Sequence, residues 1–259
     1  MSGSVLVECD GAIATVTLCN PEKMNALTLD MWRELGAAMT ALSTQDALRC
    51  VVLRGAGEQA FAAGADVLEF AALRSNAEQA RHYGAVTHAA MDALAACRHP
   101  TVAMIHGVCV GGGLEIASVC DLRICGAGSR FGVPVNKLGL VMSYGELKAL
   151  VNLTGAAVAR EIVLEGRVFG AQEAFAKGLV TRVVPDAEVA AETDSTARRV
   201  AAGAPLVARW HKQFIRRLED ARPWNALELG ESNACFDTED YRIGYAAFAA
   251  KAKPTFIGK

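Results

Sequence analysis

Short apolar runs alternate with longer segments of helical periodicity over residues 1–187. Short apolar runs bounded by Gly, Pro, Asn or Asp are typical of buried strands. Such runs occur at residues 5–7, 13–18, 50–53, 101–105, 121–125 and 180–184. From residue 188 onward the pattern is helical throughout. Strands that alternate with helices predict an α/β core at residues 1–187, and the remaining segment predicts a C-terminal helical region at residues 188–259.

Apolar residues at helical spacing predict the helices between these strands. The first helix begins after Thr28, a predicted N-cap. Its apolar stripe consists of Leu29, Trp32, Leu35, Met39 and Leu42. Further helices are predicted at residues 67–97, 144–153, 156–164, 171–177 and 239–251. Asp10 and Gly11 predict a hairpin turn between the first two strands, and residues 131–134 are predicted to form a loop.

The stretch from Thr101 to Glu115 combines a buried strand, a cluster of glycines and the start of a helix. Gly111, Gly112 and Gly113 have no Cβ atom, so a ligand can approach the backbone closely. The start of a helix presents unpaired N–H groups, which suit an anion or a carbonyl oxygen that becomes negative during a reaction. Glu115 follows directly and is a candidate for proton transfer at such a carbonyl. Taken alone, the glycines are equally consistent with tight packing of a helix on a strand.

A dehydrogenase is the rival interpretation of this stretch. Gly107, Gly111 and Gly113 fit a glycine-rich nucleotide-binding turn, and Tyr144 and Lys148 have the Tyr-x-x-x-Lys spacing of short-chain dehydrogenases. A dinucleotide-binding fold needs that turn after its first strand, with an acidic residue about twenty positions further on. Here the turn lies in the middle of the chain, and the next apolar run follows too soon for a full crossover helix. We therefore reject this interpretation.

Composition narrows the class of protein further. The 259 residues carry a formal net charge of −2, so there is no general basic field for nucleic acid. No apolar run approaches the length of a membrane span, and the N-terminus lacks the pattern of a signal peptide, so we expect a cytoplasmic protein. The eight cysteines form no Cys-x-x-Cys pair, and Cys50, Cys109 and Cys125 are expected to be reduced core residues. The five histidines show no metal-binding spacing, and no metal site is expected.

A second segment of small residues, Phe61-Ala-Ala-Gly-Ala-Asp66, pairs with the glycine cluster. Two such loops can supply two backbone N–H donors, which is the usual construction of an oxyanion hole. With these two motifs the chain resembles the crotonase superfamily, also called the enoyl-CoA hydratase/isomerase family, almost from end to end. The other matching stretches are Asn20-Pro21, Asn25-Ala26-Leu27, His106-Gly107, Cys120-Asp121, Phe131-Gly-x-Pro134, Leu138-Gly139, Ala174-x-x-x-Gly178-Leu-Val180, Phe248 and Lys253-Pro254.

The resemblance implies a fold, an assembly and a ligand. The fold is a crotonase-like spiral of ββα units with a C-terminal helical region that forms a lid and trimer contacts, in a homotrimer or a hexamer built as a dimer of trimers. The ligand is a coenzyme A thioester, bound as substrate with no separate cofactor. The oxyanion donors are the N–H groups of Ala65 and Gly112, and Glu115 matches the first catalytic glutamate. The substrate-binding positions implied are Lys23, Met24, Ala26, Ala63, Asp66, Val67, Val108, Val110, Gly111, Pro134, Val135 and Gly139. Lys23 is a candidate contact for a phosphate, and Lys251 and Lys253 for the nucleotide of a neighbouring subunit.

One departure from the family pattern bears on the reaction. Hydratases carry their second glutamate directly after the proline of Phe-Gly-x-Pro, and this chain has Val135 there. Glu146 is the nearest candidate for a replacement carboxylate, although its position fits better the first turn of a helix, where the dipole favours a glutamate. Tyr144 is a possible proton donor that we expect to be packed. We therefore expect a lyase or isomerase that stabilises a thioester enolate, with a non-catalytic acyl-CoA-binding protein of the same fold as the alternative. The acyl group, and the choice among hydration, isomerisation, decarboxylation and binding alone, stay open.

Overall fold

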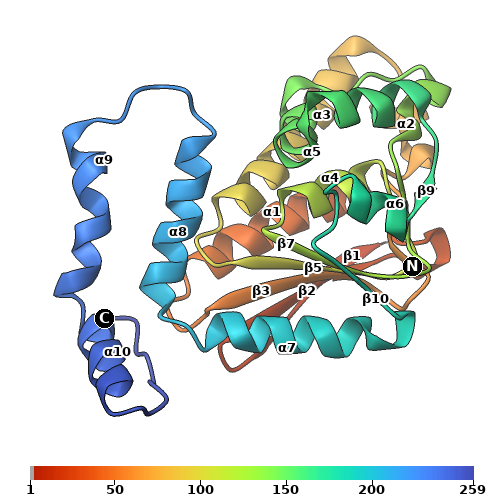
Figure 1. The fold of residues 1–259 in the computed structure, drawn as a ribbon. Helices are drawn as coiled ribbons and strands as arrows, with labels where there is room; N and C mark the ends of the chain where they lie inside the picture. The colour runs from red at the N-terminus through yellow and green to blue at the C-terminus, as the bar shows by residue number, and fades with distance from the viewer. Residues whose placement is uncertain (1–2) are drawn as a thin grey trace.

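The computed structural model describes residues 3–259, which contain two β-sheets surrounded by helices (Figure 1). The main sheet has six strands in the order β1-β2-β3-β5-β7-β10. Its strands are β1 (Ser4–Asp10), β2 (Ile13–Cys19), β3 (Cys50–Gly55), β5 (Thr101–Ile105), β7 (Leu122–Gly126) and β10 (Arg182–Val184). The first two strands form the predicted antiparallel hairpin, and the remaining neighbours run parallel. This arrangement confirms the predicted α/β core.

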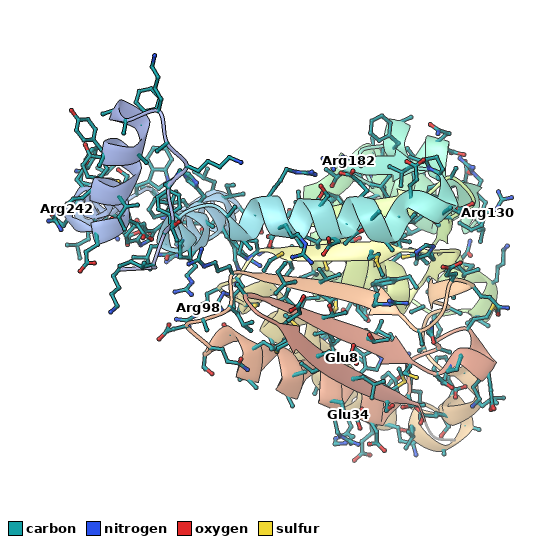
Figure 2. The ribbon with its side chains drawn as sticks, turned by 90° about the horizontal axis from the view of Figure 1, so that it is seen from below. Glu8, Glu34, Arg98, Arg130, Arg182 and Arg242 are labelled. Carbon is teal, nitrogen blue, oxygen red and sulfur yellow. The ribbon has the colours of Figure 1, made fainter. Side chains whose placement is uncertain are left out.

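Each face of the main sheet packs against a different layer of helices, because successive side chains of a strand point to opposite sides. Along β3, Val51 and Leu53 belong to the large hydrophobic core, and Cys50 and Val52 belong to a smaller one. The large core includes side chains of α1 (Leu29–Ser43), α3 (Ala77–Ala96) and α4 (Gly112–Val119). The smaller core is closed by α7 (Val189–Ala201), which lies along the other face of the sheet (Figures 1 and 2). The sequence pattern predicts a core that ends at residue 187. Because α7 begins at Val189 and covers one face of the sheet, the core extends into the predicted C-terminal helical region.

A second, smaller sheet was not predicted from the sequence. It has the strand order β4-β6-β8-β9. Its strands are β4 (Ala60–Ala62), β6 (Val108–Val110), β8 (Arg130–Gly132) and β9 (Phe169–Gly170). Strands of two or three residues are too short to show a period of two, so no pattern in the chain identifies them. The loop predicted at residues 131–134 is wrong in part, because its first residues belong to β8 and Pro134 begins the short 3₁₀ helix η3 (Pro134–Leu138).

One predicted helix is divided in the structure, and the predicted interruption between two others is confirmed. The segment at residues 67–97 is divided into η2 (Val67–Glu69), α2 (Phe70–Leu73) and α3, with a break after α2. Residues 144–164 form α5 (Tyr144–Glu165), and the predicted interruption is present at Gly155, whose φ of 78° is not helical. The short predicted helix at residues 171–177 is α6 (Ala171–Ala176).

The last helices leave the core and lie apart from both sheets (Figure 1). They are α8 (Pro205–Leu218), α9 (Ala226–Gly230), the 3₁₀ helix η5 (Glu231–Asp237) and α10 (Glu239–Ala249). Lys212 of α8 forms an ion pair with Asp121 at 2.8 Å, which attaches this helix to the end of β7. Figure 2 shows Arg242 of α10 at the opposite end of the molecule from Arg130 of β8. Large apolar side chains are exposed on this part: Ile215, Leu218, Trp224, Leu227, Leu229, Phe236, Tyr241, Tyr245 and Phe248.

All eight cysteines are free, as predicted, and the three named core cysteines are fully buried. Burial raises the pKa of the Cys50 thiol to about 12, so it stays protonated and packs as a small apolar residue. No helix within residues 3–259 has both the length and the apolar character that a membrane span requires.

Candidate active site

Two loops meet where the small sheet adjoins the start of α4. Gly64, which follows β4, has a φ of 98° and lies against the backbone of residues 110–112. A Cβ atom at Gly64 would lie 3.4 Å from the carbonyl oxygen of Val110 and 3.7 Å from the backbone nitrogen of Gly112. Gly111 also has a positive φ, of 50°. Residues with side chains rarely adopt these conformations, so the glycines allow the two loops to touch.

This contact brings two unpaired N–H groups to one place. Leu27 and Ala65 form an isolated parallel bridge, in which Leu27 N donates to Gly64 O and Asp66 N donates to Leu27 O. That pairing leaves the N–H of Ala65 directed away from Leu27. Gly112 is the first residue of α4, so its N–H has no acceptor within the helix. The N–H groups of Ala65 and Gly112, which the family resemblance suggested as oxyanion donors, are therefore both free at this contact.

The other glycine of the cluster fixes the position of α4. A Cβ atom at Gly113 would lie 2.3 Å from the carbonyl oxygen of Ala62, a separation that a real side chain cannot adopt. The start of α4 therefore packs directly on β4, and this packing places Glu115, two residues after Gly113, at the adjoining cavity.

The two donors and Glu115 line a cavity of about 130 Å³. It lies between the two loops, α2, α3, η3 and the start of α5. Nine residues assigned to the site from the sequence line it: Ala63, Ala65, Val67, Val110, Gly111, Gly112, Glu115, Pro134 and Val135. The structure thus gathers into one place residues that come from three separate segments of the chain.

Glu115 is the acid of α4 that lines the cavity together with the two donors. Burial in the cavity, and after it the negative charge of Glu146, raise the pKa of Glu115 to about 8, while the positive charge of Arg74 opposes the shift. A carboxyl group with this pKa is mostly protonated at neutral pH and is close to the range that suits proton transfer in either direction. Strong perturbation of this kind, in a cavity that also holds oxyanion donors, is typical of functional sites.

Glu146 has two roles in the structure. It closes the capping box of α5, because Ser143 N donates to Glu146 Oε2 at 2.5 Å and Glu146 N donates to Ser143 Oγ at 3.3 Å. It also lines the cavity that contains Glu115. Tyr144 neither takes part in the capping box nor lines the cavity. The expectation that Tyr144 is packed is wrong, because 95% of its surface is exposed. As the first residue of α5, Tyr144 points to the outside while Glu146 turns inward.

Val135, in the first turn of η3, forms an apolar part of the cavity wall. It packs at the edge of the large core and brings no polar atom to the cavity. The side of the cavity where the family pattern places a second glutamate is therefore apolar in this chain.

Six positions assigned from the sequence lie outside this cavity. Lys23 forms an ion pair with Asp66 at 2.5 Å, and Asp66 also caps η2 by accepting a hydrogen bond from Leu68 N. Asp66 is buried, so its first role here is structural. The other four are Met24, which is exposed, Ala26, which is buried, Val108, which is in β6, and Gly139, which ends η3. Lys251 and Lys253 are exposed after α10.

The sequence did not identify a second group of cavity residues. Phe70 and Arg74 are at the two ends of α2, Tyr83 is on α3, and Trp32 is on α1. Trp32 was assigned only to the core stripe of its helix, and the other three fall in a segment that shows nothing but helical periodicity. Their meeting depends on the break between α2 and α3, which the pattern did not show. The remaining wall residues are Gly84, Thr87, Leu138, Leu140, Val141 and Met142.

Residues 3–259 contain no group of three or more His, Cys, Asp or Glu side chains arranged to hold a metal ion.

The comparisons with known proteins agree with this fold. The family model described as enoyl-CoA hydratase/isomerase matches residues 8–259. The chain therefore belongs to the enoyl-CoA hydratase/isomerase family, the crotonase superfamily, as the motifs indicated. It is 31% identical over 255 residues to a short-chain-enoyl-CoA hydratase of Clostridium acetobutylicum, covering 96% of each chain. It is 28% identical over 256 residues to a mitochondrial Delta(3,5)-Delta(2,4)-dienoyl-CoA isomerase of Dictyostelium discoideum, covering 94% of this chain and 87% of the other. A solved structure of an enoyl-CoA hydratase/carnithine racemase from Magnetospirillum magneticum is similar with a TM-score of 0.98 and 50% identity, over 100% of this chain and 97% of that one.

Proposed function

We propose that this protein is an acyl-CoA-processing enzyme that forms a thioester enolate in the cavity of Glu115. The observation that carries the proposal is the meeting of two unpaired N–H donors, from Ala65 and Gly112, beside a carboxyl group with a raised pKa. Two donors aimed at a thioester carbonyl stabilise the negative oxygen of the enolate, which makes the neighbouring α-carbon acidic. Removal of one donor from such a site costs on the order of 3 to 4 kcal/mol of transition-state stabilisation.

The proposed substrate class is a coenzyme A thioester, with no separate cofactor. The relatives described above are named for enoyl-CoA and dienoyl-CoA substrates, and they match this chain over nearly its full length. A thioester also suits the geometry, because its carbonyl oxygen can accept hydrogen bonds from the N–H groups of both loops.

The cavity favours isomerisation, or another reaction that needs a single acid, over addition of water. In isomerisation, the ionised Glu115 removes a proton from the α-carbon, the electrons move to the thioester oxygen, and the resulting carboxylic acid returns the proton to the γ-carbon. One group completes this cycle, and no proton is gained or lost overall. Hydration needs a further group to activate water, and Val135 provides none.

A non-catalytic acyl-CoA-binding protein is the second candidate, and Val135 is the observation that favours it. If Glu146 serves only to cap α5, the cavity retains the donors but has Glu115 as its single acid for proton transfer. Exchange of the α-proton separates these two candidates, because enolate formation replaces that proton and simple binding does not.

Calorimetry with acetoacetyl-CoA first tests binding, and proton NMR of butyryl-CoA in D₂O then tests enolate formation. We expect heat of binding at micromolar to millimolar ligand and enzyme-dependent loss of the α-proton signal. Binding without exchange would favour the non-catalytic candidate. Absence of binding at millimolar ligand would contradict both.

We also propose that the chain assembles as a trimer or as a pair of trimers. The C-terminal helices expose many apolar side chains in the single chain, and α8 buries only Pro205 among its residues. Apolar patches of this kind mark surfaces that associate.

A further inference from the structure

Arg74 is the only arginine on the cavity wall of residues 3–259, and two aromatic rings hold it in place. Its guanidinium carbon lies 4.6 Å from the centre of the Phe70 ring and 4.7 Å from the centre of the Tyr83 ring. The two rings meet edge to face, with centres 6.3 Å apart. Cation–π contacts with both rings restrict the guanidinium and leave its N–H groups as the free polar edge.

The polar edge of Arg74 has no partner in the described part of the chain. Its Nε atom is buried and makes no hydrogen bond within residues 3–259. Two acids that precede Arg74 in the chain are committed elsewhere, because Asp66 pairs with Lys23 and Glu69 accepts a hydrogen bond from Leu29 N at 2.8 Å. A buried N–H without an acceptor costs stability, so an acceptor supplied by water or by a ligand is expected at this edge.

Two further polar groups lie buried on the same wall, the hydroxyl of Tyr83 and the indole N–H of Trp32. The indole of Trp32 lies beside the phenol of Tyr83 and acts on it as a hydrogen-bond donor, and neither group has a partner elsewhere among residues 3–259. Burial raises the pKa of Tyr83 to about 12, so the phenol keeps its proton and can donate it. The cavity is otherwise mostly apolar, so Arg74 and the Tyr83 hydroxyl are its side-chain donors without an acceptor in the described part of the chain, and Trp32 supports Tyr83.

We propose that Arg74, supported by Tyr83 and Trp32, binds a carboxylate at the far end of the acyl group. The preferred substrate is then a coenzyme A monothioester of a short dicarboxylic acid. This inference rests on the proposed function and adds the class of acyl group. The planar guanidinium matches a carboxylate with two parallel hydrogen bonds, and a pair removed from water is stronger than one on the surface. The cavity volume of about 130 Å³ limits the acyl chain to a short one.

The other acids of the cavity are compatible with an anionic acyl group. Glu115 is mostly uncharged at neutral pH, since its pKa is about 8. Glu146 keeps one carboxylate oxygen on the backbone N–H of Ser143 at the start of α5, where the helix dipole offsets part of its charge. Arg74 is thus the charged group that is left free to meet the ligand.

A matched pair of thioesters tests the inference without requiring turnover. Glutaryl-CoA and pentanoyl-CoA have acyl chains of the same length and differ in carrying a terminal carboxylate or a terminal methyl group. Calorimetry should give tighter binding of glutaryl-CoA to the unmodified protein, by about 10-fold or more. Arg74→Met, which keeps the length and packing of the side chain, should weaken glutaryl-CoA by about 30-fold or more and leave pentanoyl-CoA within about 3-fold.

Two further variants make the result specific. Arg74→Lys keeps the charge and loses the planar fork, so it should retain only part of the preference. Arg33→Met is the control, because Arg33 is an exposed arginine of α1 that pairs with Asp30 and lies outside the cavity. It should change neither affinity.

The possible results distinguish a wrong role for Arg74 from a wrong assignment of the acyl-CoA function. If the unmodified protein binds pentanoyl-CoA as tightly as glutaryl-CoA, the proposed role of Arg74 is wrong. The proposed acyl-CoA function is not affected by that result. Equal weakening of both thioesters by Arg74→Met also overturns the proposed role of Arg74, since Arg74 would then act only by supporting the wall. If neither thioester binds, the proposed function itself is contradicted. The comparison on the unmodified protein decides the question even if Arg74→Met does not fold.

Discussion

The carboxyl groups of Glu115 and Glu146 belong to one cavity, although one comes from α4 and the other from α5. Burial is the larger cause of the raised pKa of Glu115, and the negative charge of Glu146 adds to it. Glu146 is fixed by its capping box, so this charge is held at a constant place. Glu146, the residue that caps α5, therefore also affects the protonation state of Glu115, the proposed catalytic acid.

Glu115→Gln should remove proton transfer and leave binding intact. Glutamine keeps the size and the hydrogen-bonding capacity of the side chain but cannot accept the α-proton. We expect exchange of the α-proton, and any turnover, to fall by about 100-fold or more. The affinity for acetoacetyl-CoA should change little, because the oxyanion donors are on other residues. Glu188→Gln, at an exposed glutamate of the 3₁₀ helix η4 (Asp186–Glu188), is the control and should behave like the unmodified protein. Normal exchange by Glu115→Gln would assign Glu115 a structural role.

Glu146→Gln should shift the pH dependence of proton abstraction. Abstraction requires the ionised form of Glu115, so in the unmodified protein the exchange rate should rise with pH through a midpoint near about 8. The charge of Glu146 raises this pKa, and its removal should therefore move the midpoint to lower pH. Glutamine can still accept the hydrogen bond from Ser143 N, which preserves the cap. An unchanged midpoint would show that the charge of Glu146 does not reach Glu115.

The sequence predicted the main sheet and the catalytic motif for the same physical reason. Strands such as β5 are apolar runs with clear boundaries, and the donors and Glu115 lie within two short contiguous motifs, so local patterns contain the information. The small sheet depends on tertiary contacts between distant segments. So does the part of the cavity wall that Arg74 forms with Trp32, Phe70 and Tyr83. The break beside Arg74 does have a local signal, because Asn76 is a typical N-cap residue and caps α3. Nothing near Arg74 in the sequence shows that Tyr83 and Trp32 approach it. Such sites can be found only when the packing is known.

Lys23 is expected to contribute to stability through Asp66. Lys23→Met leaves the buried carboxylate of Asp66 without its ion-pair partner, and we expect a loss of about 1 to 2 kcal/mol in the free energy of unfolding. The estimate is modest because the side chain of Lys23 is 45% exposed. Urea unfolding measures the effect, and a double-mutant cycle with Asp66→Asn isolates the pair. Additive losses in that cycle would mean that the ion pair contributes nothing, and that Lys23 is available for a phosphate.

Assembly should depend on the exposed apolar side chains of α10. Phe248 is 86% exposed, and Phe248→Glu places a charge on the surface that we expect to be buried between subunits. Light scattering should give a trimer or hexamer for the unmodified protein and a smaller species for the variant. Phe175→Glu, at a half-exposed aromatic residue of α6, is the matched control. A stable monomer of the unmodified protein at micromolar concentration would contradict the proposed assembly.

Val135 should limit hydration of crotonyl-CoA. Its side chain makes one wall of the cavity apolar, so a water molecule held there lacks a hydrogen-bond partner and is poorly ordered. We expect weak hydration by the unmodified protein, or none, while exchange of the α-proton is much less affected. The absorbance of the conjugated thioester follows the reaction directly.

Val135→Glu should raise the hydration rate, because a carboxylate at this position can activate the water that valine cannot hold. Val135→Gln is the matched control, since it has nearly the same shape and cannot ionise. A gain with glutamate alone, by about 10-fold or more, would assign the effect to base catalysis. Burial will raise the pKa of the introduced carboxyl group, so the gain should be larger at about pH 8 than at about pH 6. Fast hydration by the unmodified protein would show instead that another acid has replaced the missing glutamate. Glu146→Gln would then identify Glu146 as that acid if it abolished the reaction.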